Sequence, residues 1–161
     1  MVHDITHVET LKRVKLSDKL IEDVINMNED AVADAIEEIH RRECTPLHYN
    51  NEQSLRTVIK LGFFAYRDKY LQFEELPSGN GYADIVYIPI KYSNCPVLVI
   101  ELKWDKTAIS ALDQIKDRHY PEVLKGFDEE ILLVGISYDK DDESKKHYCK
   151  IERILPEIID N

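Results

Sequence analysis

Two carboxylates and a lysine lie within two consecutive apolar stretches of the chain. Asp84 is part of GYADIVYIP (residues 81–89), and Glu101 and Lys103 stand near the end of PVLVIELKW (residues 96–104). Charges removed from water must be paired or bound to a metal ion. Mg²⁺ and Mn²⁺ prefer carboxylate and carbonyl oxygens, and a bound metal lowers the pKa of its water so that hydroxide can attack phosphorus. These residues therefore predict a metal-dependent phosphodiesterase site.

Side-chain alternation decides which of these groups share a face of a strand. Glu101 and Lys103 fall on one face of the second stretch, and Leu102 and Trp104 on the other. Asp84 is expected on the face of Val86 and Ile88, beside Glu101 if a hairpin pairs the two stretches. We assign Asp84, Glu101 and the Leu102 backbone carbonyl as metal ligands. Lys103 is assigned to orient the attacking water or to hold a phosphate oxygen.

The elements that must position these groups follow from hydrophobic periodicity. Residues 15–43 predict two amphipathic helices with Ser17 and Asn28 as N-caps, and a third helix is predicted over residues 52–66. A fourth helix should begin near residue 107 and stop near Pro121. Five strands are expected, over residues 69–77, 81–90, 95–104, 129–139 and 146–154.

This order predicts an α/β fold, with a mixed central sheet between helices and an N-terminal helical segment in front of it. We expect residues 1–48 to form that segment and residues 49–161 to form the domain that carries the site.

Composition limits the class of protein. The chain has 161 residues and a formal net charge of −10, which argues against coating nucleic acid through a large basic surface but leaves room for a local basic groove. Three widely separated cysteines predict neither a disulfide framework nor a zinc site, and the six histidines show no HExxH spacing. With no signal-like or membrane-spanning stretch, we expect a cytoplasmic protein.

The combination GNGYADIVYIP, VLVIELKW and ALDQIKDRHY resembles the PD-(D/E)XK nuclease superfamily. More narrowly, it resembles the nuclease-like C-terminal domain that commonly follows an AAA-type ATPase domain in bacterial and archaeal proteins, from about Leu16 onward. The resemblance implies a restriction-endonuclease-like core of order αβββαββ, with Mg²⁺ or Mn²⁺ as cofactor. It also implies DNA as substrate and an ATPase domain as partner, in cis or in trans.

The resemblance also implies roles for residues outside the central motif. Glu52 falls where the superfamily has a first-helix glutamate and becomes a further candidate metal ligand. Gln114 and Tyr120 match residues that line the site or touch substrate. Tyr82, also assigned to the substrate shell, stands where many relatives have arginine, and Ala83 replaces the motif's proline.

Other interpretations remain open from the residues alone. Asp84 and Lys103 could form a structural salt bridge, and Glu52 could be a first-turn residue favoured by the helix dipole. A catalytically weak or inactive interaction module associated with an ATPase is the alternative to an enzyme, and the charge of −10 and Tyr82 favour it. We expect an excised or stand-alone C-terminal domain, and a homodimer stays open.

Overall fold

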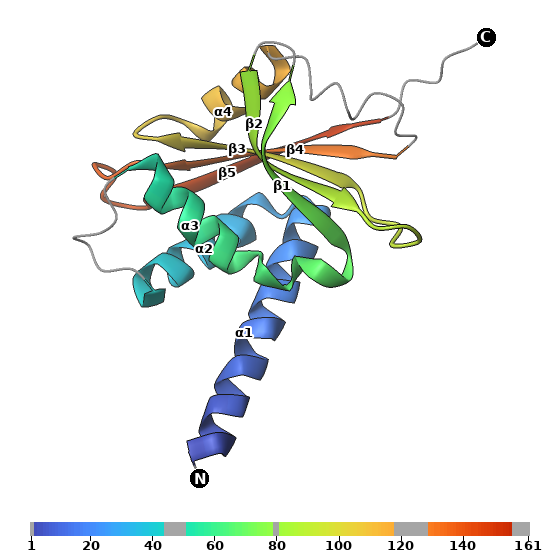
Figure 1. Ribbon diagram of the computed structural model, residues 1–161. Helices are drawn as coiled ribbons and strands as arrows, with labels where there is room; N and C mark the ends of the chain where they lie inside the picture. Colours follow the sequence, from blue (N-terminus) through green and yellow to red (C-terminus); the bar gives the residue numbers. More distant parts are fainter. Residues whose placement is uncertain (1, 44–50, 79–80, 118–128, 156–161) are drawn as a thin grey trace.

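A five-stranded mixed sheet forms the centre of the molecule (Figure 1). The computed structural model describes residues 2–43, 51–78, 81–117 and 129–155. The strands lie side by side in chain order; β3 and β4 are parallel and the other neighbours antiparallel. The predicted α/β architecture is confirmed. The strands are β1 (Tyr70–Ser78), β2 (Gly81–Pro89), β3 (Val97–Trp104), β4 (Ile131–Tyr138) and β5 (His147–Ile154).

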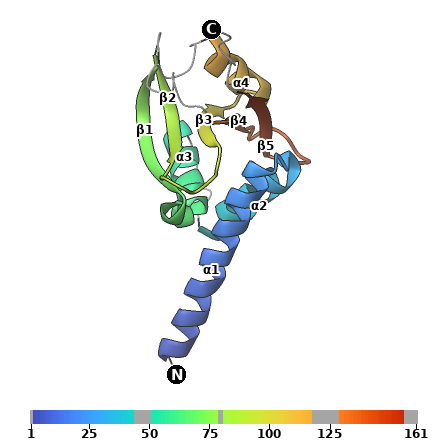
Figure 2. The same ribbon diagram turned by 90° about the vertical axis from the view of Figure 1, so that its right-hand side faces the viewer.

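Helices cover both faces of this sheet (Figures 1 and 2). On one face lie α1 (Val2–Ile25), α2 (Glu29–Glu43), α3 (Glu52–Gly62) and the 3-10 helix η2 (Phe64–Asp68). On the other lies α4 (Ala108–Asp117). The N-terminal half of α1 projects away from the body of the protein. Among the described residues, no helix combines the length and apolar character that crossing a membrane would require.

Alternation along β3 sorts the core into two clusters. Leu98, Ile100 and Leu102 join the cluster beneath α1, α2 and α3, and Trp104 packs against it. Val97 and Val99 join the cluster beneath α4. The predicted division of β3 into two faces is therefore confirmed for its apolar residues.

The first helix differs from its prediction. It begins at Val2 rather than at Ser17, so Ser17 lies inside the helix and is not an N-cap. Its buried hydroxyl donates to the Gly62 carbonyl oxygen at 2.7 Å and accepts from the Ala65 amide at 3.0 Å. Serine favours caps because it competes locally for backbone hydrogen bonds, but here a tertiary partner takes the hydroxyl.

Close approach of α4 to the sheet requires Gly135 on β4. A Cβ at this position would lie 2.4 Å from the Ala108 carbonyl oxygen. The glycine thus lets the first turn of α4 rest directly on β4, which fixes the distance between that helix and neighbouring β3.

The hairpin of β1 and β2 is irregular beside Asp84. The pairs Glu74↔Ile85 and Leu76↔Ala83 keep one register, yet Glu75 between them has φ 52°. Ala83 belongs to the core cluster beneath α4, whereas Ile85 belongs to the opposite cluster. Alternation therefore breaks at Asp84, which frees its side chain from the face that Val86 occupies.

Carboxylates of α2 cover the outer edge of β5. Glu29 Oε2 accepts from the Ile151 amide at 2.7 Å, and Glu37 Oε1 accepts from the amides of Lys146 and His147 at 2.8 and 2.7 Å. Backbone donors on a border strand otherwise remain available to another chain. Here the helix supplies acceptors for two donors of the strand, His147 and Ile151, and for the Lys146 amide just before it.

Candidate functional site

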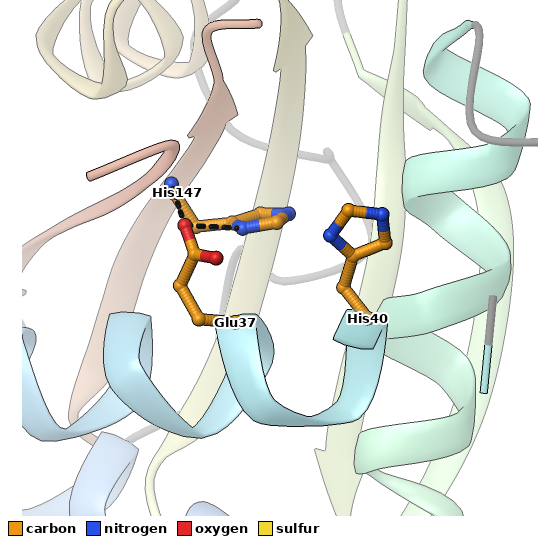
Figure 3. Close-up of side chains that lie close together, drawn as sticks. All are labelled: Glu37, His40 and His147. Atoms are coloured by element: carbon orange, nitrogen blue, oxygen red, sulfur yellow. Dashed lines mark hydrogen bonds and ion pairs between the residues drawn. The ribbon is translucent and has the colours of Figure 1, made fainter. Parts of the chain in front are cut away.

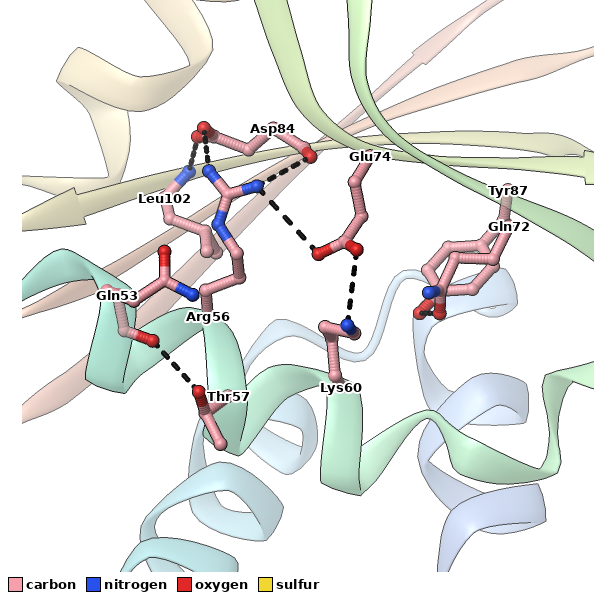
Figure 4. A network of polar contacts seen from close by, with 9 residues as sticks. All are labelled: Gln53, Arg56, Thr57, Lys60, Gln72, Glu74, Asp84, Tyr87 and Leu102. Carbon is pink, nitrogen blue, oxygen red and sulfur yellow. Dashed lines mark hydrogen bonds and ion pairs between the residues drawn. The ribbon is translucent and has the colours of Figure 1, made fainter.

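Asp84 joins three elements through its carboxylate. Oδ2 accepts a hydrogen bond from the Leu102 amide at 2.8 Å, and Oδ1 lies 2.9 Å from Arg56 Nη2 (Figure 4). Arg56 Nη1 also donates to the Asp84 carbonyl oxygen at 3.2 Å. The carboxylate thus links β2 to β3 and, through Arg56, to α3. This corrects the expectation that Asp84 shares the face of Val86.

Local sequence explains why α3 delivers Arg56 to this position. Asn51 caps the helix by accepting from the Ser54 amide at 2.9 Å, and Leu55 and Val58 anchor its apolar stripe in the core. Arg56 lies beside that stripe, with only 10% of its side chain exposed. The sequence interpretation missed Arg56. Its place between two buried positions was the available signal.

Glu101 is held from the α4 side of the sheet. Its side chain is 3% exposed and lies 3.6 Å from the Lys103 ammonium nitrogen. Gln114, on α4, donates from Nε2 to Glu101 Oε1 in a short hydrogen bond. The predicted neighbours Glu101 and Lys103 are therefore in contact, and Gln114 reaches the same carboxylate. The structural salt bridge considered for Asp84 and Lys103 is replaced by two other pairs, Arg56–Asp84 and Lys103–Glu101.

The strands β2 and β3 part where these carboxylates lie. Their last recorded pair on this side is Ile85↔Ile100, so Asp84 and Glu101 are the next residues along the two strands. The Leu102 amide turns from the ladder to the Asp84 side chain. Because the N–H and C=O of one strand residue point to the same edge, the Leu102 carbonyl also faces the β2 side.

The other predicted site residues are less directly connected. Glu52 is the first residue of α3 and half-buried, one turn before Arg56. Tyr82 lies on β2 opposite Pro77, and its side chain is outside the described part of the structure. Tyr120 also lies outside the described residues. The carboxylate oxygens of Asp84, Glu101 and Glu52 do not all lie within 4.8 Å of one another, so these three described residues do not form a compact cluster of ligands.

The chemistry of the donors nevertheless fits a hard divalent cation. The two carboxylates are buried or nearly buried and belong to the residues that follow the last β2–β3 pair, and the Leu102 carbonyl faces β2; oxygen ligands of this kind suit Mg²⁺ and Mn²⁺. One feature restricts the fit, since Arg56 holds Asp84 Oδ1. A metal bound here would share Asp84 with that guanidinium.

Comparison with known proteins gives one family. A family model described as the PD-(D/E)XK nuclease superfamily matches residues 50–148. The match runs from just before α3 to the start of β5 and includes Arg56, Asp84, Glu101, Lys103 and Gln114. No curated protein matches the chain.

Proposed function

The chain belongs to the PD-(D/E)XK nuclease superfamily, and we propose that it hydrolyses phosphodiester bonds in DNA with a divalent metal ion. Nucleases of this superfamily generally use divalent metals, and their substrates are nucleic acids. The observation that supports the proposal is the position of Asp84 and Glu101, which directly follow the last recorded β2–β3 pair, together with the hydrogen bond from the Leu102 amide to Asp84.

Each residue has a distinct part in this proposal. Asp84, Glu101 and the Leu102 carbonyl would hold Mg²⁺ or Mn²⁺, and a bound ion of this kind makes hydroxide available at neutral pH. Lys103 lies 3.6 Å from Glu101, near enough to orient the attacking water or to contact a phosphate oxygen. Gln114 fixes the Glu101 carboxylate from α4.

One observation favours a second candidate, an interaction module without strong catalysis. Arg56 already neutralises Asp84 in a nearly enclosed pair, which supplies the compensation that a metal ion would otherwise give. Resemblance to domains that follow AAA-type ATPases supports an ATPase domain as its partner, in cis or in trans. The net charge of −10 is also more typical of such a module than of a protein that binds DNA broadly.

A nuclease assay separates the two candidates. The full chain would be incubated with single-stranded, duplex and branched DNA in Mg²⁺ and in Mn²⁺, beside Lys103→Ala and the exposed control Lys106→Ala. We expect cleavage by the wild type and by the control, with loss of a factor of about 10² or more in Lys103→Ala. Equal cleavage by both variants would remove Lys103 from the mechanism. No cleavage of any substrate would favour the interaction module.

A further inference from the structure

A second group of side chains that could hold a metal ion lies at the contact between α2 and β5, on the face of the sheet that α2 covers (Figure 3). Glu37 and His40 are one turn apart on α2, and His147 is the first residue of β5. Ligand atoms of the three side chains all lie within 4.8 Å of one another. In the described part of the chain, no other group of three histidine, cysteine, aspartate or glutamate side chains has its ligand atoms this close together.

Glu37 and His147 bring two potential ligand atoms together. His147 Nδ1 lies 2.9 Å from Glu37 Oε1, the oxygen that also accepts from the backbone amides of Lys146 and His147. Donor atoms on one zinc ion are roughly 3.5 Å apart. A metal ion held by this pair would therefore be bound through Nδ1 of His147.

Other side chains enclose the two histidines. His147 is fully buried, and His40 is half-buried beside it, with ring centroids 5.3 Å apart. Tyr138 closes the same space, its ring 5.0 Å from that of His147. Trp104 stacks on Tyr138 at 4.5 Å and excludes water further.

The spacing on α2 is itself a known ligand pattern. Glu37-Glu38-Ile39-His40 reads Glu-x-x-His, which places a carboxylate and an imidazole on one helix face. Bonds of roughly 2.0–2.2 Å to such ligands bring their donor atoms to roughly 3.5 Å from one another. The half-buried side chains of Glu37 and His40 can make this adjustment, whereas His147 is already fixed.

We propose that Glu37, His40 and His147 bind a divalent transition-metal ion, of which Zn²⁺ is the representative. Two imidazoles and a carboxylate suit Zn²⁺, Co²⁺ or Ni²⁺ better than Mg²⁺, which prefers an all-oxygen set. Glu37 and His40 precede residue 50, where the family match begins, and none of the three ligands is a residue of the proposed nuclease centre. The bound ion joins the N-terminal helices to the sheet and stabilises their contact.

Metal titration of the full chain tests the proposal. Zn²⁺ binding is measured by calorimetry and by the shift in melting temperature, and Co²⁺ is used as a spectroscopic probe of imidazole ligands. The variants are His40→Ala and Glu37→Gln, with His7→Ala on exposed α1 as the matched control. We expect one Zn²⁺ per chain in the wild type and in His7→Ala, and affinity lower by about tenfold or more in the other two.

Asp84→Asn separates this site from the nuclease centre. The proposal requires that this variant bind Zn²⁺ as the wild type does. Wild-type affinity in His40→Ala and Glu37→Gln would overturn it, as would loss of Zn²⁺ binding in Asp84→Asn alone. Absence of Zn²⁺ and Co²⁺ binding by the folded wild type would overturn it as well. None of these results depends on whether DNA is cleaved.

Discussion

Arg56 of α3 and Asp84 of β2 form an ion pair that the protein almost completely encloses. Arg56 Nη2 lies 2.9 Å from Asp84 Oδ1, and the two side chains are 10% and 14% exposed. The Asp84 carboxylate therefore has two partners: the guanidinium of Arg56 on α3 and the backbone amide of Leu102 on β3. Its role in folding and its proposed role at a metal ion depend on the same two oxygens.

Arg56→Ala is expected to lower the free energy of unfolding by about 3 kcal/mol, because it leaves an enclosed carboxylate without its cation. The measurement is urea denaturation at neutral pH. Lys60→Ala is the matched control. Lys60 lies on the same helix as Arg56 and pairs with Glu74 of β1 at 3.2 Å, but both side chains are more than a third exposed. The control should cost less than about 1 kcal/mol. A similar loss of unfolding free energy in the two variants would show that the Arg56–Asp84 pair stabilises the fold no more than an exposed pair does.

Mn²⁺ should raise the melting temperature of the wild type, because an ion that binds only the folded state stabilises it by mass action. Asp84→Ala should abolish this shift, and Asp113→Ala, at an exposed position of α4, should retain it. Thermal denaturation with increasing Mn²⁺ provides the measurement. An undiminished shift in Asp84→Ala would place the ion elsewhere.

Gly135→Ala should destabilise the protein by about 1–3 kcal/mol through overpacking. The new methyl group would meet the Ala108 carbonyl oxygen at 2.4 Å and push α4 away from β4. Because α4 carries Gln114, contact with Glu101 should weaken and any nuclease activity should fall with it. Ile109→Ala, on the exposed side of the same helix, should change stability by less than about 0.5 kcal/mol. Chemical denaturation decides between the two outcomes.

Alkaline pH should destabilise the fold through Tyr87. Burial is the main cause that raises the pKa of this phenol far above its ordinary value, with Tyr66 and Glu74 adding to the effect. In the unfolded chain the phenol ionises near pH 10, at about its ordinary pKa. The native state then binds more protons than the unfolded state, so stability is intact below about pH 10 and falls as the pH rises further.

Tyr87→Phe tests this dependence directly. The variant loses the hydrogen bond to Gln72 Oε1, 3.0 Å away, but should show a weaker decline of unfolding free energy above about pH 10. Urea denaturation over an alkaline pH series measures both slopes. Parallel slopes would mean that Tyr87 ionises normally in the native state.

Cys149 should resist thiol reagents in the native protein. It is 5% exposed, and burial is the main cause that raises the pKa of its thiol, so little thiolate forms at neutral pH. Of the two cysteines in the described part of the chain, Cys95 is half-buried and should react before Cys149. Alkylation followed by mass spectrometry, with and without urea, identifies the modified residue at each time. Rapid native labelling of Cys149 would show that β5 opens readily.

Continuous apolar runs made the sheet predictable. The central strands are covered on both faces: Val99 and Leu133 are buried on one face and Ile100 on the other, so these strands stand out in the sequence as continuous apolar runs. Alternation then places Glu101 beside Lys103. The order of elements follows from the same signals. The contact of Glu101 with Lys103 was accessible because the two residues lie close together in one strand, whereas Gln114 reaches Glu101 from α4.

Tertiary contacts account for what was missed. Arg56 reaches Asp84 across 28 residues, and no local pattern specifies that pair. Alternation along β2 breaks at Asp84, between Ala83 and Ile85, opposite the positive φ of Glu75 on β1. Glu-x-x-His on α2 was visible in the sequence, but its third partner, His147, comes from a strand more than a hundred residues later. Periodicity predicts elements, and it does not predict which side chains from distant elements meet.

The two edge strands of the sheet, β1 and β5, differ in how readily another polypeptide can pair with them. Glu29 and Glu37 occupy amides on the outer side of β5, whereas β1 is the terminal strand at the opposite border and exposes Leu71 and Phe73. Growth by strand addition needs two receptive borders on every subunit. A subunit with a single receptive border can pair once through its backbone, so association by this route stops at two copies and cannot extend into a fibre.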